Sequence, residues 1–307
     1  MEEQKQTETK KNFPEKFGKF HDKYYKHLLM IPIVMLLFSF GYMYLFYSNN
    51  GDFIYKDISL TGGTSVTVYD DIDSGKIKVE LTEKLEEINV REIYDILTRE
   101  KIALVVETKT PGNETKQILE SYLGYKLTDK NSSFEFSGAL LGESFYNQLL
   151  TAILFAFFFM GTVIFLIFRK IIPAAAVIIS AFADILMTLV AVNLFGIKIS
   201  SAGIVAFLML IGYSVDTDIL LTNKVLKSSE GLLNEKIFKA FKTGMTMTLT
   251  SVVAVFIALI ISNSFSVVLS QIFTILLIGL FFDIFNTWIT NVSLIKWYVT
   301  GKQVSVK

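Results

Sequence analysis

Six long apolar segments limit how this chain can fold more than any other feature of its sequence. A bilayer core about 30 Å thick is crossed by an α-helix of roughly 20 apolar residues. Segments of this kind are Leu28–Tyr47, Leu149–Phe168, Ile171–Phe195, Ile199–Thr222, Thr243–Ile261 and Val267–Trp288. The pattern predicts an α-helical polytopic membrane protein with six transmembrane helices.

The composition agrees with a membrane protein and excludes several kinds of site. Hydrophobic residues make up 52% of the chain and its mean hydropathy is +0.49. There is no cysteine, and the only two histidines, His21 and His27, lie near the start. Disulfides, thiol catalysis and a histidine-based centre in the spans are therefore excluded, and we expect no metal site and no cofactor. The first segment is too long for a cleaved signal peptide, and no small-residue cleavage site follows it.

Lysine and arginine predict the orientation of the chain, because short cytoplasmic flanks carry an excess of these residues. They gather in the first tail, in the connection between spans two and three, in the connection between spans four and five, and in the last tail. These residues are Lys5, Lys10, Lys11, Lys16, Lys19, Lys23, Lys26, Arg169, Lys170, Lys224, Lys227, Lys236, Lys239, Lys242, Lys296, Lys302 and Lys307. The short connections on the other side offer only Lys198. We therefore predict a cell-membrane protein with cytoplasmic tails at residues 1–27 and 299–307. The first transmembrane helix is then residues 28–47, and residues 149–298 hold the other five.

Residues 48–148 form one long segment that this orientation places outside the cytoplasm. The segment carries 18 acidic and 11 basic residues, a net charge of −7. Thr64–Tyr69 and Ala103–Thr108 have the alternation and β-branching of strands, and Val90–Glu100 and Glu114–Leu123 have the pattern of amphipathic helices. We predict an extracytoplasmic α+β domain of the split βαβ, ferredoxin-like type between helices one and two.

Four aspartates lie within the predicted spans: Asp184, Asp216, Asp218 and Asp283. An acidic residue at the centre of a spanning helix costs about 2.5–3.5 kcal/mol, and no basic residue lies in these spans. Asp216 and Asp218 are two residues apart and so point about 200° apart on one helix. We expect one of them to face the bundle interior and the other the headgroup region or another subunit.

We interpret Asp216 and Asp184 as a candidate proton relay. A carboxyl group in a low dielectric favours its protonated form, which lets it bind and release protons near neutral pH. Small residues on spans three, four and five favour close packing, so we expect Asp184 and Asp216 to meet in an inner bundle. Asp218 and Asp283 are secondary polar candidates. The alternative for each aspartate is a hydrogen bond to a neighbouring helix, through Ser180, Ser214, Thr188 or Thr217.

Four stretches of the chain carry distinctive motifs: Gly212–Thr222, Asp57–Thr64, Ser137–Gly142 and Asp283–Trp288. They resemble members of the SecD/SecF family, and SecF in particular, the accessory membrane subunit of the Sec protein-export machinery. The first is similar to the fourth-span motif of SecF and is the most specific. The second resembles the D-F-x-G-G-T element that opens the first extracytoplasmic domain. The resemblance extends from Leu28 to Tyr298 and is closer to the archaeal branch than to the bacterial one.

The resemblance implies a fold, a function and a set of partners. The fold is half of a resistance–nodulation–division (RND) transporter, with six spans and one outer domain after the first. The implied function is that of a non-enzymatic accessory subunit that acts with SecD, which supplies the other half. The pair assists SecYEG in moving a translocating polypeptide across the lipid bilayer and draws on the proton-motive force. No nucleic acid is expected as a partner.

The resemblance also places individual residues. Asp216 stands where SecD proteins carry their fourth-span aspartate. Bacterial SecF has asparagine at that position and its aspartate one residue later, where this chain has Thr217. Lys242 falls near a basic position that bacterial members carry at the start of span five. Thr217 and Lys242 therefore join the secondary polar candidates.

Two other classes of function are compatible with intramembrane acids. The first is an RND-type half-transporter that exports small molecules, against which the small outer domain of 101 residues argues. The second is an intramembrane aspartyl protease with Asp184 and Asp216 as its dyad. The presenilin-like pattern has glycine directly before the catalytic aspartate, where this chain has Val215, and a Pro-Ala-Leu element that this chain lacks.

Overall fold

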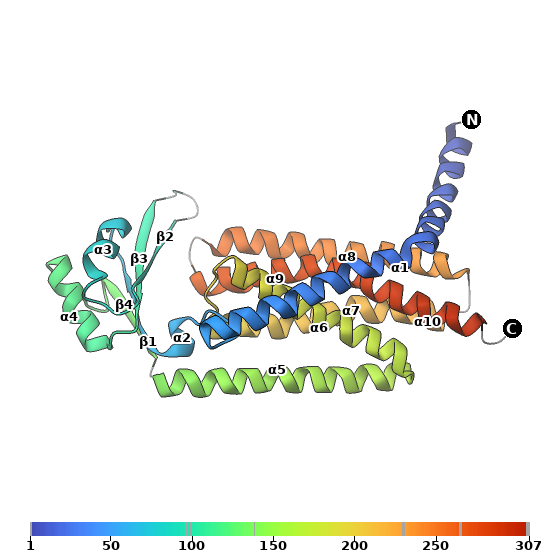
Figure 1. The fold of residues 1–307 in the computed structure, drawn as a ribbon. Helices are drawn as coiled ribbons and strands as arrows, with labels where there is room; N and C mark the ends of the chain where they lie inside the picture. The colour runs from blue at the N-terminus through green and yellow to red at the C-terminus, as the bar shows by residue number, and fades with distance from the viewer. Residues whose placement is uncertain are drawn as a thin grey trace.

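The protein consists of a long helical bundle with a small sheet domain at one end (Figure 1). The computed structural model describes the backbone of residues 2–95, 98, 100–137, 139–228, 231–263 and 266–304. Among these it describes the side chains of all but residues 2–23, 26, 137, 139–141 and 302–304. We call the end of the bundle beside the sheet domain the near end, and the opposite end the far end.

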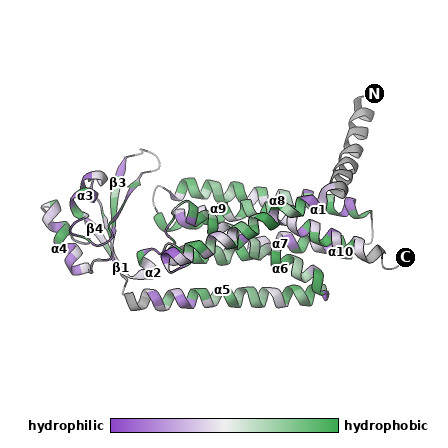
Figure 2. Ribbon diagram, in the orientation of Figure 1, coloured by the Kyte–Doolittle hydropathy of each residue, from purple (hydrophilic) through white to green (hydrophobic). Residues whose placement is uncertain are grey.

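Six helical segments among the described residues are long and apolar enough to cross a membrane, which confirms the predicted number. They are α1 (Glu2–Asn50), α5 (Ala139–Phe168), α6 (Ile171–Leu194), α7 (Ser201–Lys227), α8 (Leu233–Ser262) and a sixth that runs through α9 (Val267–Phe285), η1 (Asn286–Asn291) and α10 (Val292–Val304). Hydrophobic residues dominate these helices, whereas the sheet domain mixes hydrophilic and hydrophobic residues (Figure 2). Helix α5 begins at Ala139, well before the predicted start of its span at Leu149.

The sheet domain has the predicted ferredoxin-like topology. Its strands are β1 (Gly63–Val68), β2 (Asn89–Tyr94), β3 (Lys101–Thr108) and β4 (Ser132–Ser137), and its helices are α3 (Ser74–Leu81) and α4 (Gly112–Leu123). The sheet order is β2-β3-β1-β4, and every pairing is antiparallel. The chain order is therefore βαββαβ, with a short extra helix, α2 (Ile58–Thr61), before β1.

The predicted helix over Val90–Glu100 is wrong. Its first half is strand β2, in which Val90 lies opposite Val106 of β3, while residues 96, 97 and 99 are outside the described part. Pairing with a buried neighbouring strand overrides the helical spacing of apolar residues. Helix α3 was not expected from the sequence. It begins after Asp73, whose side chain accepts hydrogen bonds from the backbone of Gly75 and Lys76.

Helices α3 and α4 cover one face of the sheet. The residues Val66, Val68, Leu104 and Val106 point to that side and pack with Ile77, Leu81 and Leu119 of α3 and α4. Both helices lie on the side of the sheet away from the bundle (Figure 1). The other face, which carries Ser65, Thr67 and Glu107, is therefore directed towards the near end of the bundle.

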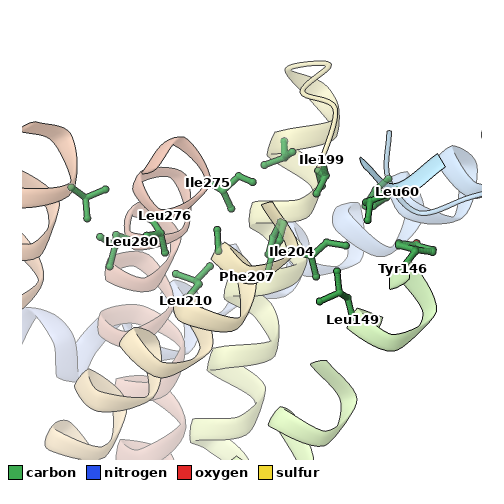
Figure 3. Close-up of a cluster of buried hydrophobic side chains, with 14 residues drawn as sticks. Leu60, Tyr146, Leu149, Ile199, Ile204, Phe207, Leu210, Ile275, Leu276 and Leu280 are labelled. Atoms are coloured by element: carbon green, nitrogen blue, oxygen red, sulfur yellow. The ribbon is translucent and has the colours of Figure 1, made fainter. Parts of the chain in front are cut away.

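A hydrophobic cluster and a short backbone ladder join the sheet domain to the bundle. Leu60 of α2 lies beside Tyr146 and Leu149 of α5, in a cluster that continues through Ile204 of α7 to Ile275 of α9 (Figure 3). The backbone of Asp57 donates to the carbonyl of Ile199 at 3.0 Å, and Ile199 donates back to Tyr55 at 2.6 Å. The segment that enters the sheet domain is thus tied to the connection between α6 and α7.

Candidate functional site: a buried aspartate cluster

Three of the four intramembrane aspartates lie together inside the bundle. Asp184 of α6, Asp218 of α7 and Asp283 of α9 are 0%, 0% and 1% exposed, and we call them the aspartate cluster. Oγ1 of Thr287 lies 2.9 Å from Oδ1 of Asp218 and 3.2 Å from Oδ1 of Asp283. Ser214 donates to Oδ2 of Asp184 at 2.5 Å. One hydroxyl thus contacts two of the carboxyl groups, and three different spans supply the cluster.

Neutral amides and hydroxyls are the hydrogen-bond partners of these carboxyl groups. Nδ2 of Asn286 donates to Oδ1 of Asp184 at 2.7 Å, and Nδ2 of Asn291 donates to Oδ1 of Asp218 at 2.7 Å. Three carboxylates this close in a low dielectric repel one another strongly when all are ionised. The cluster is therefore suited to holding exchangeable protons rather than a full set of negative charges.

The donors come largely from a π-helical turn in the sixth span. Segment η1 supplies Asn286, Thr287 and Asn291, and Thr290 donates to Oδ1 of Asn286 at 3.0 Å. A π-turn shifts the backbone bonds by one residue and is frequent at functional sites. Here it brings two asparagines and a threonine to face aspartates on α6 and α7.

Two buried oxygens around the cluster have no hydrogen-bond partner within the described part of the chain: Oγ1 of Thr222 and Oδ1 of Asn291. Thr222 lies one helical turn beyond Asp218, and Asn291 one turn beyond Thr287, in the direction of the far end. On the near side the bundle is filled by Phe207, Leu210 and their apolar neighbours (Figure 3). Spare hydrogen-bonding capacity therefore lies on the far side of the cluster.

The structure places the predicted relay residues apart. Asp184 is in the cluster, but Asp216 is exposed on the outer face of α7, so the expectation that these two residues meet is wrong. The buried face of α7 carries Ser214, Thr217, Asp218, Leu221 and Thr222 in a regular helical spacing, which sets Asp216 on the opposite side. Without an Asp184–Asp216 pair, the geometric basis of the protease alternative is also lost.

The secondary candidates also divide into residues of the buried cluster and an exposed residue outside it. Asp218 and Asp283 belong to the cluster, and Thr217 is 4% exposed and donates to Oδ1 of Asp283 at 3.2 Å. Lys242 is exposed on α8 and is not part of the cluster. The hydrogen bonds that Asn286 and Asn291 donate to the cluster were not predicted. The sequence did contain a signal for them, because these polar residues recur at the end of an otherwise apolar segment.

Comparison with known proteins relates this geometry to a family. Residues 118–301 match the family described as protein export membrane protein SecD/SecF, C-terminal. The chain is 38% identical over 284 residues to the protein-export membrane protein SecF of Methanocaldococcus jannaschii, which covers 91% of this chain and 97% of that protein. It is 34% identical over 282 residues to SecF of Methanothermobacter thermautotrophicus, which covers 90% and 93%. These relatives are named for protein export and not for a catalysed reaction.

A solved structure has the same fold. The crystal structure of SecDF, a translocon-associated membrane protein from Thermus thermophilus, matches 90% of this chain with a TM-score of 0.67 and 16% sequence identity. The match covers 38% of that chain, so this chain spans less than half of its length. The predicted architecture, six spans with one ferredoxin-like domain after the first, is thereby confirmed.

Proposed function

The chain belongs to the SecF family of protein-export membrane proteins, and we propose on that premise that it is an accessory subunit of the Sec protein translocase. It pairs with SecD and assists SecYEG in moving polypeptides across the cell membrane. Both termini are cytoplasmic and residues 48–148 are extracytoplasmic, as the distribution of lysine and arginine favours. The observation that supports the proposal most strongly is the buried aspartate cluster, together with the hydrogen-bond donors that η1 supplies to it.

The exposed position of Asp216 supports a partner in the membrane. A carboxylate that faces lipid near the middle of a span costs about 2.5–3.5 kcal/mol. On α7 it shares the exposed face with Met209 and Tyr213, which are 42% and 40% exposed. A second helical bundle that covers this face removes the cost, and SecD is the partner that the family and the longer SecDF chain suggest.

The aspartate cluster is the proposed site of coupling to the proton-motive force. Protons bind to the carboxyl groups of Asp184, Asp218 and Asp283 and exchange on the far side of the cluster, where the unpartnered oxygens lie. Asp216 lies two residues from Asp218 on the same helix, on the face that SecD covers. It takes part in the proton exchange from that face. Export then depends on cycling of these carboxyl groups between protonated and ionised forms.

An export assay in cells that lack the natural gene tests this function. Cells that carry the wild-type chain should export a reporter polypeptide normally, whereas Asp218→Asn and Asp184→Asn should reduce export without lowering the amount of chain or its co-purification with SecD. Thr162→Ala, which removes an exposed hydroxyl of α5 that bonds only within its own helix, serves as the control. Normal export with both asparagine variants would contradict the proposed coupling.

A further inference from the structure

Two clefts lie side by side between the sheet domain and the near end of the bundle. The first has a volume of about 450 Å³ and reaches Glu135 and Phe136 of the edge strand β4. The second has a volume of about 430 Å³ and reaches Asn89 and Glu92 of the opposite edge strand, β2. Arg91, Val267 and Gln271 line both clefts. Together the clefts form one groove that crosses the full width of the sheet, which we call the junction groove.

The two walls of the junction groove differ in kind. One wall is the face of the sheet that no helix of the domain covers, with Ser65, Thr67 and Val105. The other is formed by the first residues of α7 and α9, where Ser200 caps α7 and also contacts the side chain of Gln271. The second wall is held rigidly, because Gln271 also bonds the carbonyl of Lys198.

The shape of the groove fits a polymer better than a compact ligand. Pockets for small molecules are closed concavities that bury most of the ligand, whereas the junction groove runs from one edge strand to the other. Its lining combines hydroxyl groups, such as those of Ser65 and Thr67, with apolar side chains, such as Ile93 and Val105. An extended polypeptide offers both polar backbone groups and side chains to such a lining.

The charge of the first cleft selects among polypeptide segments. Asp57, Glu107 and Glu135 line it against a single basic residue, Arg91. The second cleft adds one acid, Glu92, and one base, Lys198, so the acidic excess lies in the first. The guanidinium group of Arg91 lies 2.9 Å from Glu107 and 3.9 Å from Asp57, so its charge is shared between two carboxylates. Burial, and then the neighbouring charge of Asp57, raise the pKa of Glu107. An added cation would relieve this crowding of negative charge.

We propose that the junction groove binds a short extended segment of the translocating polypeptide, with a lysine or arginine side chain of that segment beside Asp57, Glu107 and Glu135. The proposal rests on the proposed function and adds the surface that contacts the substrate. It also adds a preference for basic over acidic segments, because complementary charge attracts and like charge repels.

Single-cysteine cross-linking tests the groove directly, because the chain has no cysteine of its own. Thr67→Cys places a thiol in the groove, and Val79→Cys, at a site that is 76% exposed on α3, places one on the opposite side of the sheet. An export-arrested polypeptide with one cysteine next to a lysine is added to membranes that hold the full chain with its partners. After oxidation we expect a disulfide to residue 67 in several-fold excess over residue 79.

Charge reversal is the second arm of the test. Glu135→Lys, combined with Thr67→Cys, should lower cross-linking of the lysine-bearing segment several-fold and raise that of a matched segment with glutamate. Equal linkage at residues 67 and 79, or no response to charge reversal, would overturn the proposal. An export defect in Asp218→Asn together with no link at residue 67 refutes the groove alone. Normal export in cells that lack the chain refutes the proposed function itself.

Discussion

The side-chain amide of Asn291 donates a 2.7 Å hydrogen bond to the carboxyl group of Asp218, and both residues are 0% exposed. The contact joins the π-helical turn of the sixth span to the fourth span at the point where an acidic residue is buried without a basic partner among its hydrogen bonds. Any movement of η1 therefore changes the surroundings of Asp218. We regard this contact as the link between the protonation of the cluster and the packing of the spans.

Removal of this amide should destabilise the bundle. Asn291→Ala leaves Oδ1 of Asp218 with Thr287 as its remaining donor, and losing a buried hydrogen bond to a carboxyl group costs about 1–3 kcal/mol. Thermal unfolding of the detergent-solubilised chain should show a lower midpoint. Thr162→Ala, which removes an exposed hydroxyl of α5 bonded within its own helix, is the control and should change little. An unchanged midpoint for Asn291→Ala would refute a supporting role for this bond.

Asp283→Asn should separate stability from function. The substitution keeps the size of the side chain and removes one of three neighbouring acidic groups, so repulsion within the cluster falls. We expect a thermal midpoint at least as high as that of the wild type, together with a loss of reporter export. If export persists, Asp283 has a purely structural role.

Asp216→Leu should act on the partner interface and not on the fold of the chain itself. Asp216 is exposed on α7, so an apolar side chain at this site should leave the isolated chain as stable as the wild type in detergent. Co-purification with SecD should fall, because the substitution removes a polar contact across the covered face. Full recovery of SecD with Asp216→Leu would place the interface elsewhere.

Glu107 predicts a pH dependence of stability. Its pKa is raised by burial and by Asp57, so its contribution to stability is complete below the pKa of the unfolded chain and is lost as the pH rises through the folded-state pKa. Glu107→Gln cannot ionise and should gain stability relative to the wild type between about pH 4 and about pH 8. Thermal unfolding of the full chain at both pH values measures this change, with Glu114→Gln on the exposed side of α4 as the control. A difference independent of pH would contradict the expectation.

The sequence alone predicted those parts of the fold that depend on the pattern of neighbouring residues. The length of the apolar segments determined six spans, and the alternation in Thr64–Tyr69 and Ala103–Thr108 identified the two central strands. The assignment of Val90–Glu100 failed because a pairing partner that lies further along the chain decides between helix and strand at such a segment.

The candidate site depended on tertiary packing and was predicted only in part. The presence of acids in the spans was plain, and Ser214 was correctly named as a possible partner of an aspartate. The rotation of α7 about its axis decides whether Asp216 or Asp218 is buried, and depth in the membrane does not determine that rotation. The spacing of Ser214, Thr217, Leu221 and Thr222 does contain the answer, since all four lie on the face of Asp218.

Proton uptake by sealed proteoliposomes that contain this chain together with SecD and SecYEG tests the central claim most directly. With an imposed proton gradient and a polypeptide in transit, the wild-type complex should show proton flux that Asp218→Asn abolishes, while Thr162→Ala retains it. Equal flux in Asp218→Asn and wild-type proteoliposomes would contradict the claim that the buried aspartate cluster couples protons to export.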